Sequence, residues 1–333
     1  MTTYKGIKGF TVQTLSSDPT TADSVGQIYY NSTGNVFKYV APGGVSAGTW
    51  SSGGNLTTAR VRLAGAGTQT AGLAFGGGST TPSNPAQNAT EEYNGSSWTN
   101  GGNLNTGRRS LAGAGTQTAG LGFGGYTPPA TYRNESEEYD GSSWTAGNTL
   151  NTGRGYLAGF GVQTAALAVG GAKSPSFALS NDVEQYDGTS WSEITEINTA
   201  RFSLQGAGTS TAGLVFGGMP TFKNESEKWN GSSWTEVAEL NTGRGYFAGF
   251  GIQTAALAAG GNVTGSPALT ANTEGYNGTS WTEVNNLATA RRQLKGNGTQ
   301  TAGLAYGGTT GSQTNATEEW TVPDVLIKTI TTS

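Results

Sequence analysis

The chain has 333 residues, a formal net charge of −4 and 55 glycines, and only 12% of its residues are charged. So weakly charged a chain lacks the basic patch that binding to nucleic acid or to an anionic membrane surface requires, and no apolar run is long enough to insert into a membrane. The sequence has no cysteine and no histidine, which removes disulfides, the usual zinc ligands and Ser-His-Asp or Cys-His catalysis. We therefore expect no metal and no cofactor.

Residues 1–48 lie outside the pattern that fills the rest of the chain. The first ten residues have no apolar segment of the kind found in a secretory signal, so we expect synthesis in the cytoplasm without a signal peptide. The stretch from Gly26 to Val40 is rich in β-branched and aromatic residues on either side of a Gly/Asn turn. This pattern predicts a β-hairpin.

From residue 49 onward the sequence repeats itself with a period of 43 to 48 residues, which is best seen in its tryptophans. These are Trp50, Trp98, Trp144, Trp191, Trp234 and Trp281. Repeats of this length without a helical pattern are typical of the blades of a β-propeller.

Three polar or small landmarks keep the same rhythm. An arginine opens each unit, at Arg60, Arg108, Arg154, Arg201, Arg244 and Arg291. A Gly-Gly pair follows in each unit, first at Gly76-Gly77 and last at Gly307-Gly308. A glutamate two residues before an aromatic residue comes next, at Glu91, Glu137, Glu184, Glu227, Glu274 and Glu318.

Each unit divides into four predicted strands, shown here for the first. Residues 63–67 are small, as an innermost strand near a crowded axis requires, and residues 71–75 are apolar. A third strand over 90–93 is joined by Asn94-Gly95 to a fourth strand that ends at Trp98. Asn-Gly and Asp-Gly pairs recur at this point, and they predict type I′ turns.

The sixth unit stops after its third strand, at Trp320. The residues around Trp50 match the missing fourth strand and precede the first complete unit. We therefore expect this N-terminal strand to complete the last blade and close the ring, which removes open sheet edges.

These units resemble the kelch repeat, in which Gly-Gly, an aromatic residue after an acidic one, and tryptophan follow one another. The resemblance implies an all-β fold, a six-bladed kelch-like β-propeller, over residues 49–322. Residues 323–333 contain a further alternating segment from Val325, which predicts a strand. We expect it to pair with the N-terminal segment 1–48 and form a small β appendage.

The repeat sequences, with segments such as AGAGTQTAG and YNGSSWT, are similar to those of virion proteins of marine tailed bacteriophages, and so is the N-terminal hairpin. This resemblance implies a non-enzymatic virion protein, made in the host cytoplasm, with the terminal segments binding other virion proteins. The leading expectation is a tail or fibre component that binds a host-surface glycan or protein. A capsid decoration protein is the alternative, and a carbohydrate-active enzyme is a minor one. The sequence leaves the oligomeric state open.

The repeated arginines and glutamates have two readings: a ligand-binding ring of charge, or a structural ion pair in every blade. Because catalysis needs asymmetry and these residues recur six times, we favour the structural ion-pair ring. The run from Gly65 to Gly72 superficially resembles a phosphate-binding loop, but a predicted strand follows it in place of a helix. A pair of carboxylates for glycoside hydrolysis stays open.

The loops after Gly-Gly differ between units in length and content. They span 78–90, 126–136, 172–183, 219–226, 262–273 and 309–317. All leave the same end of the second strand, so we expect them on one face. Repeat proteins commonly bind through such a face. The candidate binding residues are Tyr126, Tyr132, Phe177, Met219 and Phe222, and loop 78–90 is a further candidate for function. Unselected drift of the loop sequences is the competing explanation.

Overall fold

A computed structural model describes residues 12–20, 24–79, 85–129, 131–264 and 269–330. The chain divides into two compact units, one formed by Met1–Gly48 with Val322–Ser333 and the other by Thr49–Thr321. The described regular structure is β, with a short 3-10 helix η2 (Val45–Ala47). The all-β prediction is confirmed.

The larger unit contains six four-stranded antiparallel sheets, called sheets 1 to 6 in chain order. Sheet 1 consists of β5 (Ala64–Gly67), β6 (Gly72–Phe75), β7 (Thr90–Tyr93) and β8 (Trp98–Asn100). Sheet 2 consists of β9 (Ala112–Gly115), β10 (Gly120–Phe123), β13 (Ser136–Tyr139) and β14 (Trp144–Ala146). Sheet 3 consists of β16 (Ala158–Val162), β17 (Ala165–Val169), β20 (Val183–Tyr186) and β21 (Trp191–Ile194).

The other three sheets repeat this plan. Sheet 4 consists of β22 (Gln205–Gly208), β23 (Gly213–Gly218), β24 (Lys223–Trp229) and β25 (Trp234–Val237). Sheet 5 consists of β26 (Ala248–Ile252), β27 (Ala255–Ala259), β28 (Thr273–Tyr276) and β29 (Trp281–Val284). Sheet 6 consists of β30 (Lys295–Gly298), β31 (Ala302–Tyr306), β32 (Thr317–Thr321) and, from the start of the unit, β4 (Thr49–Ser52).

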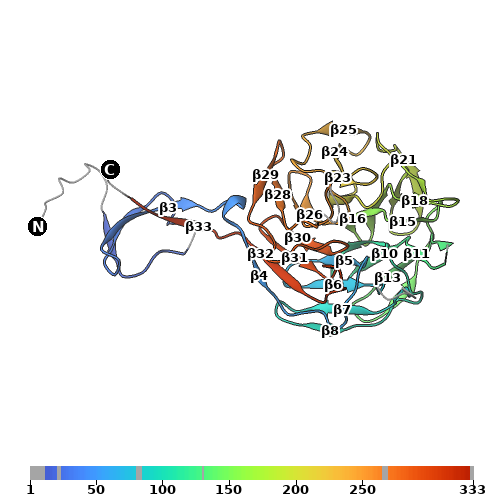
Figure 1. Ribbon diagram of the computed structural model, residues 1–333, viewed down its shortest axis with the longest axis horizontal. Helices are drawn as coiled ribbons and strands as arrows, with labels where there is room; N and C mark the ends of the chain where they lie inside the picture. The colour runs from blue at the N-terminus through green and yellow to red at the C-terminus, as the bar shows by residue number, and fades with distance from the viewer. Residues whose placement is uncertain (1–11, 21–23, 80–84, 130, 265–268, 331–333) are drawn as a thin grey trace, which may run out of the picture. The chain divides into compact units, whose positions relative to one another are not determined.

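Strand β4 pairs antiparallel with β32, and Trp50 lies opposite Trp320. The predicted pairing of the N-terminal strand with the last repeat is therefore observed. In Figure 1 the six sheets follow one another around a common centre, with their first strands innermost. Each innermost strand contacts the next, and β30 contacts β5.

The innermost strands consist largely of glycine and alanine because the backbones come so close. A Cβ atom built on Gly65 would lie 1.8 Å from the hydroxyl of Tyr306 and 2.9 Å from the carbonyl oxygen of Leu73. Any side chain at this position would collide with the neighbouring sheet. The small residues that repeat in the sequence are thus a steric requirement of the axis.

The hydrophobic core lies between neighbouring sheets. An aromatic residue of a second strand packs on the tryptophan of the next sheet, as Phe75 does on Trp144 with ring centroids 4.7 Å apart. The same contact joins Tyr306 of sheet 6 to Trp98 of sheet 1 at 4.9 Å. Burial of such large rings is the main source of stability in the unit.

In five of the six sheets, a glutamine in the turn after the innermost strand binds the preceding sheet. Gln117 of sheet 2 donates from Nε2 to the carbonyl oxygens of Gly72 and Tyr93 in sheet 1, at 3.1 and 2.7 Å. Gln69, Gln163, Gln253 and Gln300 make equivalent pairs of bonds. Sheet 4 has Ser210 at this position, so the contact between sheets 3 and 4 lacks the glutamine bonds.

We expect Ser210→Gln to stabilise the protein, because the new amide reaches the same two strands of sheet 3. The gain is about 1 kcal/mol, the net value of such hydrogen bonds. The melting temperature measures it, with Gln117→Ser as the matched reverse change, for which we expect a decrease. A melting temperature of Ser210→Gln equal to or below that of the wild type contradicts a stabilising role for these glutamine hydrogen bonds.

The smaller unit is a four-stranded sheet in the order β1 (Gln13–Leu15), β2 (Ile28–Asn31), β3 (Val36–Pro42) and β33 (Val325–Thr329). Strands β2 and β3 form the predicted hairpin, and the C-terminal strand β33 pairs antiparallel with β3. Strand β1, which the sequence did not predict, pairs parallel with β2. Tyr29, Val40 and Val325 form the buried core of this sheet.

Two predicted details of the repeats are wrong. The fourth strand begins at its tryptophan, as β8 does at Trp98, and does not end there. The Asn-Gly and Asp-Gly turns are not type I′, which needs two residues with positive φ: Gly95 has a φ of +93°, and Asn94 does not have a positive φ. Instead, Oδ1 of Asn94 accepts the N–H groups of Ser96 and Ser97 at 3.0 and 2.9 Å. The asparagine side chain organises a four-residue turn.

The pairing of β4 with β32 predicts unequal effects of two truncations. A chain of residues 46–322 keeps β4, whereas a chain of residues 54–322 loses it and exposes the edge of β32. We expect the first to unfold cooperatively near the wild-type temperature of the larger unit. We expect the second to melt at least 10 °C lower or to aggregate, as circular dichroism and size-exclusion chromatography measure. Equal behaviour of the two chains contradicts the role of β4.

Candidate functional site

The six landmark arginines form buried ion pairs with the six landmark glutamates of the same units. Their N–O distances range from 2.5 to 3.0 Å. Both side chains are almost entirely enclosed, as in Arg154 and Glu184 with 0% and 1% exposure. Burial lowers the pKa of the six guanidinium groups, and the glutamate charge opposes that shift.

Five of the six pairs join three segments of the chain. The guanidinium group of Arg201 makes no hydrogen bonds with described residues and contacts Glu227 as an ion pair at 3.0 Å. Arg154 donates from Nη1 to the carbonyl oxygens of Gly170 and Asp182, at 3.0 and 2.6 Å. The second oxygen of Glu184 accepts the N–H group of Asn151 at 2.6 Å. The pair therefore fixes the segment before the arginine, the Gly-Gly corner and the third strand of one sheet.

The arginine backbone extends this network to the preceding sheet. The N–H group of Gly125 in sheet 2 donates to the carbonyl oxygen of Arg154 at 2.7 Å. An equivalent bond from Gly308 of sheet 6 to Arg60, at 2.8 Å, joins the last repeat to the first. With every polar group turned inward, these twelve residues hold the scaffold and present no surface to a ligand.

We expect Arg154→Met to cost about 3–5 kcal/mol, because it leaves the Glu184 carboxylate buried without its cation. Replacing both residues, as Arg154→Met with Glu184→Leu, removes both charges and costs less than the single change. Urea unfolding measures both values. Arg133→Met is the control, because Arg133 and Glu135 form a half-exposed pair at 3.0 Å worth less than about 1 kcal/mol. A double variant less stable than Arg154→Met contradicts this account.

The variable loops and the segments before the innermost strands meet at one end of the sheets, which we call the loop face. In antiparallel sheets the start of a first strand lies beside the end of the second, where these loops begin. Parts of three loops, 80–84 in loop 78–90, residue 130 in loop 126–136 and 265–268 in loop 262–273, lie outside the described residues. Short strands stiffen loops 126–136 and 172–183: β11 (Tyr126–Thr127) pairs with β12 (Thr131–Tyr132), and β18 (Ala172–Lys173) pairs with β15 (Arg154–Gly155) and β19 (Ala178–Leu179).

Three of the five candidate binding residues come together on the loop face. The ring centroids of Tyr126 and Tyr132 are 5.4 Å apart, and those of Tyr132 and Phe177 are 6.4 Å apart. Phe177 also contacts Tyr156 at 5.4 Å and Phe202 at 4.7 Å. We call these five rings, together with Tyr246, the aromatic cluster.

The remaining two candidates lie differently. Met219 exchanges backbone hydrogen bonds with Phe202, at 2.7 and 3.0 Å, and so lies beside the aromatic cluster. Phe222 is half-buried, and none of the aromatic contacts in the described part of the chain involves its ring. Phe177 is 38% exposed, the most accessible ring of the group.

The most regular feature of the loop face was not recognised in the sequence. Six residues stand two positions after the landmark arginines and share a φ between +52° and +60°: Arg62, Ser110, Tyr156, Ser203, Tyr246 and Gln293. The N–H group of each donates to the carbonyl oxygen of its counterpart in the preceding sheet. The six bonds, 2.6 to 3.4 Å long, form a closed circle from Arg62 through Gln293 and back.

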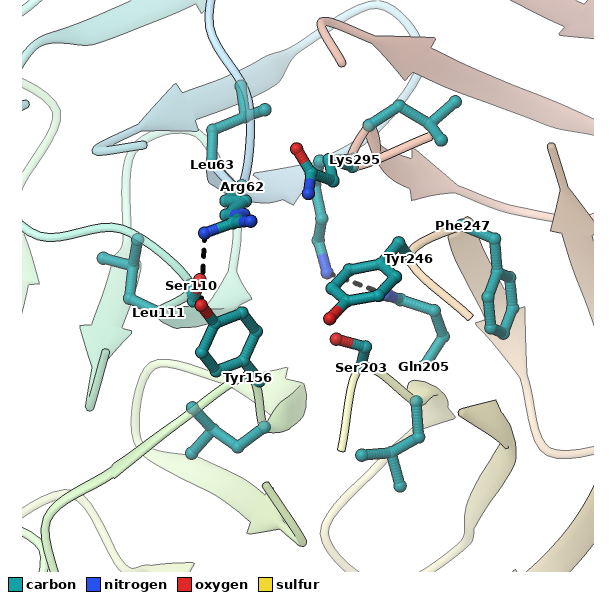
Figure 2. Close-up of a pocket in the computed structure, with 14 residues that line it drawn as sticks. Arg62, Leu63, Ser110, Leu111, Tyr156, Ser203, Gln205, Tyr246, Phe247 and Lys295 are labelled. Carbon is teal, nitrogen blue, oxygen red and sulfur yellow. Dashed lines mark hydrogen bonds between the residues drawn. The ribbon is translucent and has the colours of Figure 1, made fainter. Parts of the chain in front are cut away.

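The side chains of this circle line a pocket at its centre, which we call the axial pocket. Gln205 and Lys295, at the starts of β22 and β30, lie among its other lining residues. Its cavity volume is about 60 Å³. Figure 2 shows Arg62, Tyr156, Tyr246 and Lys295 around this space, with Lys295 reaching toward Gln205.

The axial pocket is cationic although the chain as a whole is acidic. Arg62 and Lys295 line it, and none of its described lining residues is an aspartate or glutamate. Arg62 also lies 5.6 Å from the ring centroid of Tyr156, a cation–π contact with the aromatic cluster. The pocket and the cluster are therefore one continuous surface of cations and aromatic rings.

A glycoside hydrolase needs two carboxyl groups facing one another, and the axial pocket presents none among its described residues. The described residues contain no group of three or more acidic side chains that could hold a metal ion. Within the same residues, no helix has the length and apolar character needed to cross a membrane.

Comparison with known proteins adds no identification. No protein-family model matches the chain, and none of the curated proteins compared with it gives a significant match.

Proposed function

We propose that the six sheets are the blades of a closed, kelch-like β-propeller that acts by binding, without catalysis, as a structural protein of a bacteriophage virion. The circle of six backbone hydrogen bonds and the pairing of β4 with β32 support a closed ring. The assignment to a virion rests on the similarity of the repeat sequences to those of phage proteins.

The proposed role within the virion is that of a tail or fibre component that binds a glycan or protein on the host surface. The observation that carries this role is the aromatic cluster, which gathers loops of different repeats into one surface. Rigid aromatic rings contribute large contact areas at a small entropy cost and are typical of binding surfaces. The partly exposed Phe177 lies at its centre.

The four-stranded sheet of the smaller unit favours a second role, that of a capsid decoration protein docked through this sheet. Among its described residues, Ile28, Tyr39 and Ile330 are exposed apolar side chains, with 37%, 36% and 43% of their surface accessible. Ile28 and Tyr39 lie opposite each other in adjacent strands. In either role this sheet would hold the protein to other virion proteins.

We expect Tyr132→Ala with Phe177→Ala to weaken binding of the purified protein to host cells at least tenfold, because it removes the centre of the aromatic cluster. Cell-binding isotherms with labelled protein measure the change. Ile252→Ala is the matched control, since Ile252 is an exposed apolar residue, 53% accessible, at the opposite end of an innermost strand. Unchanged binding of the double variant contradicts the role of the cluster.

Immunogold labelling of intact particles separates the two virion roles. Label at the tail supports the host-binding component, label at the head supports the decoration protein, and absence from the particle contradicts both. A glycan array followed over time tests the remaining enzyme alternative. Sugars that stay bound and uncleaved exclude it.

A further inference from the structure

Arg62 brings an unneutralised charge to the axial pocket. Its Nη1 donates to the hydroxyl of Tyr156 at 3.2 Å. In the amide orientation that satisfies both groups, the oxygen of Gln293 accepts Nε and Nη2 of Arg62 at 3.1 and 3.0 Å. These neutral partners orient the guanidinium group without cancelling its charge.

Lys295 brings a second unneutralised positive charge to the axial pocket. The corresponding first residue of the innermost strand is alanine in sheets 1, 2, 3 and 5, and only Gln205 and Lys295 depart from it. The Nζ of Lys295 donates to Oε1 of Gln205 at 3.3 Å, so the two departures meet across the axis. Burial lowers the pKa of Lys295 to about 8, which leaves it mainly protonated at pH 7.

Hydroxyl groups surround these two cations. Ser110 is 7% exposed, and its Oγ has no hydrogen-bond partner. Ser203 and Tyr246 also line the space. A buried hydroxyl without a partner costs free energy unless something binds there, so Ser110 has an unused donor in the wall of the pocket.

The size of the pocket limits the ligand. Its volume of about 60 Å³ holds only a few molecules of water size, at about 10–15 Å³ each. A sugar ring or a nucleotide does not fit inside, whereas a tetrahedral oxyanion does. Two cations and several hydroxyl donors are the groups that such an anion requires.

We propose that the axial pocket binds a small tetrahedral oxyanion, sulfate or phosphate, between Arg62 and Lys295, with the hydroxyl of Ser110 as a further donor. The ion arrives free from solution or as the terminal group of a larger molecule. This site does not depend on the proposed role in the virion, because the pocket is complete within one chain.

The competing explanation is that the Lys295 side chain fills space at the axis and binds no ligand. The two explanations differ in what sulfate does to stability. A ligand that binds only the folded state raises the melting temperature in a saturable way. If Lys295 only fills space and binds no ion, replacing it changes the effect of sulfate on the melting temperature no more than replacing another surface lysine does.

Sulfate titration of the full chain, with sodium chloride at matched ionic strength as the reference, is the decisive experiment. We expect a saturable rise in the melting temperature of the wild type, and at least a tenfold weaker apparent affinity in Lys295→Met and in Arg62→Gln. Lys173→Met is the matched control, because Lys173 pairs with Asp182 outside the pocket and should leave the response unchanged. A wild type that responds equally to chloride, or variants that keep the full response, overturns the proposal.

Without sulfate, Lys295→Met should melt above the wild type at pH 7, because it removes a half-buried charge that has no carboxylate partner among the described residues. The lowered pKa means that the unfolded chain binds more protons than the folded one between about pH 8 and the ordinary lysine pKa of 10.5. Wild-type stability relative to Lys295→Met therefore rises across that window. A Lys295→Met chain that unfolds at lower temperature at pH 7 shows that Lys295 supports the fold, and this contradicts the proposal.

Sulfate stays divalent through this range, so the pH dependence of its binding reports the protein. The titratable side chains facing Lys295 are Arg62, Tyr156 and Tyr246, and burial raises the pKa of Tyr246. We expect the affinity to fall as the pH rises through about 8, and Lys295→Arg to keep it at pH 9.5. Loss of binding at the same pH in Lys295→Arg contradicts the role of the Lys295 charge.

Galactose 6-sulfate, tested against free sulfate and unsulfated galactose, identifies the source of the ion. Tighter binding of the sulfated sugar supports a glycan-borne group, and equal binding of free sulfate and the sulfated sugar supports the free ion. Binding of galactose alone, without a response to sulfate, overturns the oxyanion site. Host-cell binding of Lys295→Met is measured in parallel, and its outcome bears on the virion role alone.

Discussion

The circle of backbone hydrogen bonds around the axis is the constraint on which the larger unit depends. Six residues without the freedom of glycine adopt left-handed backbone angles, each at a cost of order 1 kcal/mol. Each offsets that cost with an N–H···O bond to the neighbouring sheet. Each hydrogen bond of this circle can form only if the two neighbouring sheets that it joins are in register. The arginine–glutamate pairs supply that register, because each fixes the segment immediately before its residue of the circle.

The same constraint explains why the sheets themselves could be predicted from the sequence. Small residues at the axis, Gly-Gly at the corner and tryptophan at the fourth strand are steric or packing requirements that recur in every repeat, and repetition made them visible. The pairing of the strand around Trp50 with the last repeat followed from counting strands. The arginines and glutamates were also visible as landmarks. Their place in the core, with Arg154 fully buried, came only from the structure.

The details that could not be predicted are those in which a side chain overrides a local rule. Asn94-Gly95 favours a type I′ turn by composition, but the asparagine carboxamide accepts two N–H groups and holds a longer turn. The residues of the axial circle were missed for another reason. Arginine, serine, tyrosine and glutamine share no chemistry, so the position is constant only in its backbone angle. The available signal was a variable residue between an arginine landmark and a leucine or phenylalanine.

Departures from the repeat therefore carry more information about function than the repeat does. An alanine at the start of the innermost strand satisfies the crowded axis in four sheets. Lysine at that position in sheet 6 adds a half-buried charge, and glutamine in sheet 4 supplies a neutral acceptor at 3.3 Å that leaves the charge intact. A scaffold under selection for stability alone would neutralise that ammonium group or replace it with an apolar residue. Its retention beside Arg62 and the unpartnered hydroxyl of Ser110 is best explained by an anion that completes the site.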